Sequence, residues 1–159
     1  MLRRVSIAGL IAAAAATLVG GCGEGGHTMR FVSSRPHLLT LDLGRHGKSS
    51  GDLYVFNAPL LDKSGGRVIG SLHGTQTSIR LEHGAETVQG ILTFEFGNGN
   101  SVVVGGLSQY PHAGTGTIVN HKFARAVLGG TGKYAGATGT LISKRRPDGN
   151  YEQELRLTD

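Results

Sequence analysis

The sequence of 159 residues predicts an all-β domain, a closed antiparallel barrel of about eight strands. From residue 37 onward, short apolar and β-branched runs alternate with turns rich in Gly, Asn and Asp, a spacing typical of barrels and sandwiches. The 27 glycines follow no Gly-X-Y period, which excludes a collagen-like chain. No run of ten or more residues in this part has a helical period, so helix content should be minor.

Strand-length runs can be placed along the whole of this part. A barrel built from such runs encloses packed side chains or one small ligand. Two connections, 96–101 and 147–150, carry the Gly, Asn and Asp residues that tolerate positive φ, so both predict hairpins. The expected strands are 37–43, 52–57 (stopped by Pro59), 67–81, 86–96, 101–107, 116–120, 123–128, 139–144 and 151–157.

Alternation inside the runs predicts which face is buried. In 86–96, Val88, Leu92, Phe94 and Phe96 share one face, and polar residues predominate on the other. The run 151–157 alternates in the same way, as expected of antiparallel strands with one buried and one wetted face. Glycines inside the runs suit the bends of a closed barrel, which has no exposed strand edge; they are Gly70, Gly74 and Gly90.

The first 36 residues predict export. Arg3 and Arg4 precede an apolar run, 5–19, which is too short to span a bilayer and ends in small residues, so 1–21 is interpreted as a signal peptide. Residues 19–22 resemble a bacterial lipobox, which implies acylation of Cys22 and anchoring to the cell envelope membrane. Ordinary cleavage near 14–16, giving a secreted chain with a free thiol, is the alternative. We then expect a flexible tether, 22–36, and a barrel domain, 37–159.

Charge and metal-ligand types restrict the partners. Without Arg3 and Arg4 the chain has 14 basic and 11 acidic residues, too small an excess to indicate nucleic acid binding. The basic triplet 144–146 is interpreted as a solvated strand end. None of the seven histidines forms an i, i+2 pair, and Cys22 is the only cysteine, so no metal or other cofactor is expected.

One glycine-rich segment resembles a known family. Residues 126–139 are similar to the Gly-Gly-Thr-Gly-Lys-aromatic segment of allene oxide cyclase-like and dirigent-like β-barrels, which include exported bacterial members. Residues 55–60, 68–74 and 93–102 support the resemblance in the same order, and it covers 37–159. It implies an eight-stranded barrel with a central apolar cavity. The segment itself is expected to form a tight bend through Gly129, Gly130, Thr131, Gly132, Gly136 and Gly139.

The resemblance leaves three functions open. The first is a binding module that holds a small hydrophobic or aromatic molecule in its cavity and steers its conformation. The second is a cofactor-independent isomerase or cyclase, and the third is an inert envelope protein with a filled barrel. A homo-oligomer stays open, and the cavity is expected to be lined by Asn57, Val88, Leu92, Phe94, Phe96 and Tyr151.

Catalysis would need a titratable group in the cavity, because burial there shifts its pKa. Asp42, His73 and Tyr110 are the candidates. Glu95 lies between Phe94 and Phe96 in an alternating strand, so it is predicted to face solvent. Dirigent proteins carry an acidic pair before Pro-Leu, where this chain has Asn57 and Ala58. Phenol coupling of the plant type is therefore not implied.

Overall fold

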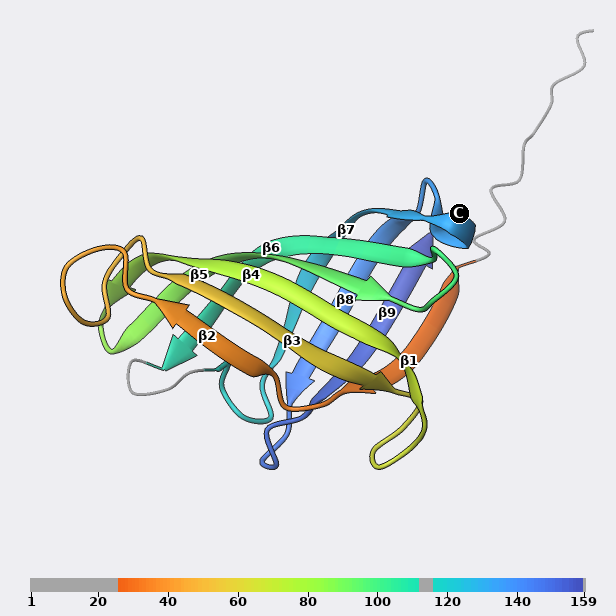
Figure 1. Cartoon of the computed structure of the whole chain (residues 1–159), viewed down its shortest axis with the longest axis horizontal. Coiled ribbons are helices and arrows are strands. Elements are labelled where there is room, and N and C mark those ends of the chain that lie inside the picture. The colour runs from red at the N-terminus through yellow and green to blue at the C-terminus, as the bar shows by residue number, and fades with distance from the viewer. Residues whose placement is uncertain (1–25, 112–115, 159) are drawn as a thin grey trace, which may run out of the picture.

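The computed structural model describes residues 26–111 and 116–158, and in this part the chain is all-β (Figure 1). The predicted signal peptide, 1–21, and Cys22 lie outside the described residues. One 3-10 turn, η1 (Gly132–Tyr134), accompanies the strands. These are β1 (His27–Ser33), β2 (His37–Leu41), β3 (Leu53–Leu61), β4 (Val68–Glu82), β5 (Ala85–Glu95), β6 (Ser101–Pro111), β7 (Lys122–Thr131), β8 (Thr138–Arg145) and β9 (Tyr151–Thr158).

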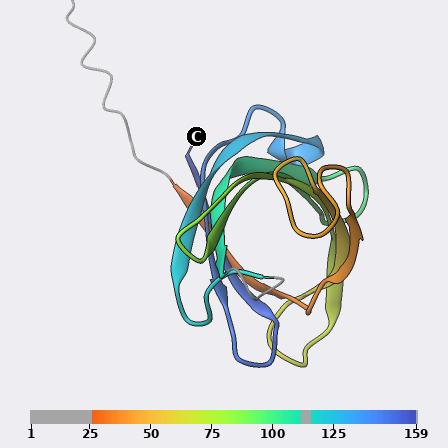
Figure 2. The same ribbon diagram turned by 90° about the vertical axis from the view of Figure 1, so that its left-hand side faces the viewer.

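The strands close into an antiparallel barrel, and Figure 2 shows the resulting ring. Their order is β1-β9-β8-β7-β6-β5-β4-β3-β2, and β1 also pairs with β3. Together β1 and β2 occupy one position of the ring. β1 pairs with β9 and reaches β3 through Val32 and Ser33, and β2 then follows β3 from Asn57 to Leu53. The predicted eight-stranded antiparallel barrel is confirmed.

The barrel begins earlier than the sequence predicted. β1 lies wholly inside the stretch expected to be a tether, 22–36, so the expected boundary at residue 37 is wrong. Phe31, Val32 and Ser33 are buried, and all seven residues of β1 have partners in β9. This short strand, with its polar first half, carries too weak a pattern to be recognised beside a Gly-rich segment.

Two further expectations are wrong. β3 continues through Pro59, where it was expected to stop. The Pro59 carbonyl accepts a hydrogen bond from the Ser34 N–H (3.0 Å). Because the nitrogen and the carbonyl of one strand residue point to the same side, the Pro59 nitrogen also faces Ser34, which lies in the connection between β1 and β2. The N–H that proline lacks would therefore lie between two pairing strands, and its absence removes no hydrogen bond of β3 to β1 or β2. Residues 116–120 form no strand and contribute only a bridge between Val119 and Arg145.

The turns follow the glycine chemistry of the sequence. Asn98 has a φ of 54°, and the β5–β6 hairpin and the β8–β9 hairpin are both present as predicted. The glycine-rich segment turns β7 into β8 through η1. A Cβ on Gly132 would lie 2.4 Å from Asn100 Oδ1, which accepts a hydrogen bond from the Lys133 N–H (2.9 Å). The bend is thus fastened to the neighbouring hairpin.

The interior is divided along its length. Toward the β5–β6 hairpin it is closely packed around Phe94, with Phe31 in edge-to-face contact at 5.6 Å. The predicted alternation of β5 and β9 is confirmed, since Val88, Leu92 and Phe94 are buried, as are Gln153 and Leu155. Toward the other end the buried residues become polar: Gln76, Ser78, Glu86, Ser108, Arg125 and Ser143. None of the described helical residues forms an apolar segment long enough to cross a membrane.

Candidate functional site: a cavity with a buried arginine

A cavity of about 150 Å³ lies where the polar part of the interior begins. Side chains from all nine strands contribute to its wall, and the β1–β2 connection, residues 116–117 and the β8–β9 hairpin form its rim. The wall combines apolar and aromatic surface with polar and charged side chains, so it can contact the apolar part of a ligand and also form hydrogen bonds. Its apolar and aromatic residues are Leu38, Phe56, Leu72, Leu92, Tyr110, Phe123 and Tyr151.

Inward-facing glycines make room for two of the wall side chains. A Cβ on Gly74 would lie 2.4 Å from the ring of Phe56, so this ring lies directly over the glycine. A Cβ on Gly90 would lie 2.5 Å from Cγ of Gln76. Both glycines were expected at barrel bends, and here they also allow large wall side chains to lie close to the sheet.

Neutral hydrogen bonds connect the polar residues of the wall. Tyr110 Oη donates to Gln76 Oε1. Ser143 Oγ donates to Gln153 Oε1 (2.6 Å), and Gln153 Nε2 donates to Ser33 Oγ (2.9 Å). Burial raises the pKa of Tyr110 well above its ordinary value, so the phenol stays neutral across the physiological pH range.

Arg125 is the one wall residue that brings a deeply buried charge. It is 4 % exposed, its Nη2 donates to Ser108 Oγ, and its guanidinium lies 4.6 Å from the centre of the Phe123 ring. Its Nε is buried and has no hydrogen-bond partner among the described residues. Burial lowers the pKa of Arg125, and the nearby Tyr110 and Tyr151 oppose that shift. An arginine nevertheless stays protonated in proteins.

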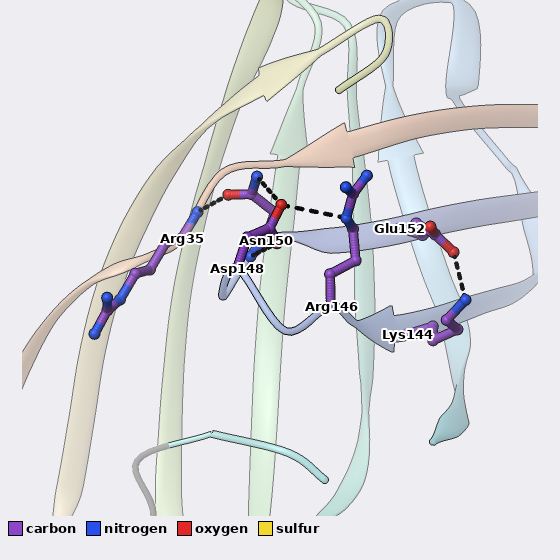
Figure 3. Close-up of polar contacts among 6 residues, drawn as sticks. All are labelled: Arg35, Lys144, Arg146, Asp148, Asn150 and Glu152. Atoms are coloured by element: carbon purple, nitrogen blue, oxygen red, sulfur yellow. Dashed lines mark hydrogen bonds and ion pairs between the residues drawn. The ribbon is translucent and has the colours of Figure 1, made fainter. Parts of the chain in front are cut away.

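The rim is held together by polar contacts of the β8–β9 hairpin (Figure 3). The Arg35 N–H donates to Asn150 Oδ1 (2.9 Å), which joins the β1–β2 connection to this hairpin. Asp148 accepts a hydrogen bond from the Asn150 N–H (3.0 Å) and pairs with Arg146 Nε (3.3 Å). Arg145 Nη1 donates to the Thr117 carbonyl (3.2 Å), so a second segment is fixed at the rim.

A second buried charge lies outside the cavity wall. Glu86 is fully buried, accepts a hydrogen bond from Tyr54 Oη (2.7 Å) and pairs with Lys48 Nζ (2.6 Å). Burial, followed by the bond to Glu86, raises the pKa of Tyr54. The buried Asp52 accepts a hydrogen bond from the Ser49 N–H (2.7 Å), which holds its pKa below the ordinary value. These contacts fasten the loop between β2 and β3 to the barrel.

The structure brings some of the sequence-predicted residues to the cavity. Leu92, Tyr110 and Tyr151 line it. Val88 is buried in a small cluster beside Tyr110, outside the lining. Phe94 belongs to the packed core, and the partly buried Phe96 packs against that core.

Three expected residues face away from the cavity. Asn57 is exposed on the outer face of β3, so its assignment to the cavity is wrong, because Phe56 and Ala58 take the inward positions. Asp42 lies on an exposed loop, where it accepts a hydrogen bond from the Gly47 N–H (2.8 Å). His73 is exposed on the outer face of β4, 2.9 Å from Ser71 Oγ, and Glu95 faces solvent as predicted. Neither Asp42 nor His73 can act in the cavity from these positions.

Sequence reasoning missed Arg125, Gln76 and Gln153 as cavity residues. The alternation of inward and outward positions offered a signal for each of them, since Gln76 alternates in phase with Leu72, Arg125 with Val127 and Gln153 with Leu155. Across residues 26–111 and 116–158, no three His, Cys, Asp or Glu side chains come together as a metal site.

Comparison with known proteins finds similarity at the level of the fold. No protein-family model and no curated protein matches the chain. Pyocyanin demethylase is a similar solved structure (TM-score 0.67, 22% identity, covering 83% of this chain and 100% of that one). The pterocarpan synthase dirigent protein GePTS1 has a TM-score of 0.61 and 18% identity, covering 95% and 98%. The Diels-Alderase AbmU from Streptomyces koyangensis has a TM-score of 0.60 and 14% identity, covering 87% and 70%.

These similarities confirm, for the fold, the resemblance to dirigent-like barrels indicated by the glycine-rich segment. The fold is the β-barrel of dirigent proteins and of cyclases such as the Diels-Alderase. At these identities the likeness concerns the fold alone.

Proposed function

We propose that this barrel binds one small, mainly apolar or aromatic molecule in its cavity and holds it in a defined conformation. The cavity of about 150 Å³ carries this proposal, because a barrel filled by its own side chains would leave no such space. A cavity of this volume is large enough for about one benzene ring. Similar folds named for reactions of small organic molecules, a demethylase and a Diels-Alderase among them, support it.

The chemistry of the wall favours binding over an isomerase activity that depends on proton transfer. Among its described residues there is no carboxylate and no imidazole, the groups that most often transfer protons in enzymes. Tyr110, with its raised pKa, stays neutral and donates to Gln76, so its hydroxyl oxygen remains to accept a hydrogen bond from a ligand.

The proposal predicts binding of a neutral aromatic probe that depends on an open cavity. Benzamide should bind the wild-type protein, and Leu92→Trp should abolish binding because the larger ring fills the space beside Leu92. Ile91→Trp is the matched control, since Ile91 is the neighbouring residue on the outer face of β5. Titration followed by NMR measures both affinities, and circular dichroism verifies that each variant is folded.

Two outcomes would contradict this proposal. Wild-type protein that binds neither benzamide nor a neutral hydrophobic dye has no usable cavity. Equal loss of binding in Leu92→Trp and Ile91→Trp would place the probe outside the barrel.

We also propose that the chain is exported and lipid-anchored through Cys22. The charged start, the apolar run 5–19 and the small residues before Cys22 support this. Cys22→Ser should release the protein from the membrane fraction, and the mass of the mature wild-type chain should include the lipid at Cys22. A mature chain of unmodified mass that begins near residue 15 would instead establish ordinary secretion.

A further inference from the structure

The charge on the cavity wall is unbalanced. Arg35, Arg125 and Arg145 all line the cavity, and no acidic side chain is found among its described lining residues. Two carboxylates outside the lining already have partners: the buried Glu86 is paired with Lys48 and bonded to Tyr54, and Asp148 at the rim is paired with Arg146. The cavity therefore presents positive charge to whatever occupies it.

Arg125 is the most buried of these three arginines, and one of its N–H donors has no hydrogen-bond partner among the described residues. An unpaired charge away from water is costly, so buried arginines are ordinarily paired with carboxylates. Here the protein supplies one hydroxyl, Ser108, and one aromatic face, Phe123, and leaves the Nε donor without a partner. Arg125 forms none of the ion pairs found among the described residues. An anionic ligand would supply the missing acceptor.

The rest of the wall restricts the anion. Aromatic and aliphatic side chains, including Phe56, Leu72 and Leu92, face the same cavity, and its volume matches about one ring. A planar carboxylate fits the fork of N–H donors on a guanidinium, and a charge-assisted bond of this kind is about twice as strong as a neutral one. We infer that the cavity recognises a monocyclic aromatic carboxylate, with the ring against the apolar wall and the carboxylate on Arg125. This inference rests on the proposed binding function and specifies its ligand class.

Benzoate and its neutral isostere benzamide test the inference separately from the binding function. Wild-type protein should bind benzoate at least about tenfold more tightly than benzamide, because only benzoate balances the charge of Arg125. Arg125→Met should abolish this preference, so that benzoate and benzamide bind the variant with similar affinity. Titration calorimetry or NMR at fixed ionic strength measures all four affinities.

Lys122→Met is the matched control. It removes one positive charge from the same strand, but Lys122 is exposed and outside this cavity. The preference for benzoate should survive this substitution. Inorganic phosphate at the same concentration should not displace benzoate, since it makes no use of the apolar wall.

Each result is decisive. Failure of benzoate, benzamide and the neutral hydrophobic dye alike to bind would refute the binding function itself. Benzamide binding without a preference for benzoate, or a preference retained in Arg125→Met, would overturn only the carboxylate inference, as would displacement by phosphate. If Arg125→Met does not fold, Arg125→Lys keeps the charge without the fork and should weaken benzoate binding about tenfold. Unchanged affinity in that variant would also overturn the inference.

Discussion

A chain that begins at His37 will not fold into the barrel, whereas a chain that begins at Gly26 will. Without β1 the barrel loses a strand that pairs with β9 at seven positions and closes the ring through Val32 and Ser33. Phe31 and Val32 also leave the core, and each such side chain contributes about 1.5–3 kcal/mol when buried. Against a total stability of about 5–15 kcal/mol for a domain, this loss, together with the exposed edge of β9, removes the folded state.

Circular dichroism and urea unfolding measure this effect. The chain from Gly26 should unfold cooperatively, and the chain from His37 should show no cooperative transition. Phe31→Ala in the longer chain is the graded control, and we expect a folded protein destabilised by about 3–5 kcal/mol. A cooperative transition of similar midpoint in the shorter chain would show that β1 is dispensable.

Replacement of Lys48 by methionine should lower the free energy of unfolding by about 3 kcal/mol. The substitution leaves the fully buried carboxylate of Glu86 without its cation, and only the Tyr54 hydroxyl remains on it. This value is at the low end for a broken buried pair because the Lys48 side chain is 26% exposed. Urea unfolding at neutral pH measures the difference.

Two further variants identify the cause. Lys63→Met removes an exposed lysine from the β3–β4 loop and should change stability by less than about 0.5 kcal/mol. Glu86→Gln added to Lys48→Met should recover part of the loss, because the buried group is then neutral. A Lys48→Met protein as stable as the Lys63→Met protein would mean that water already satisfies Glu86.

The fold could be predicted from the sequence where a pattern is repeated. β5 and β9 alternate over eight or more residues, and their buried faces are those that the alternation indicated. β1 was missed because its seven residues acquire their partners from the far end of the chain, at β9, and no local pattern announces such a pairing. The strand end predicted at Pro59 was wrong for a similar reason. β3 pairs with β2 before Pro59 and with β1 after it, and this change of partner exists only in the closed barrel.

The cavity was less predictable because apolar character identifies a core more readily than a cavity wall. Phe94 was expected at the cavity and instead fills the packed end. Arg125 was not considered, because an arginine in a strand is ordinarily solvent-facing. Its inward direction follows from parity with Val127, and its missing partner becomes visible only when the neighbouring strands are in place.

The packed end and the cavity end of the interior should also differ in the substitutions that they tolerate. Around Phe94 the side chains are interlocked, so that only substitutions that conserve volume are tolerated there. Around the cavity, apolar side chains such as Leu38 and Leu92 already border empty space, and their replacement removes fewer contacts. A library randomised at such apolar positions of the wall should therefore consist mainly of folded barrels. Selection could then act on ligand preference with little cost in folding, which makes this chain a suitable starting scaffold for directed evolution.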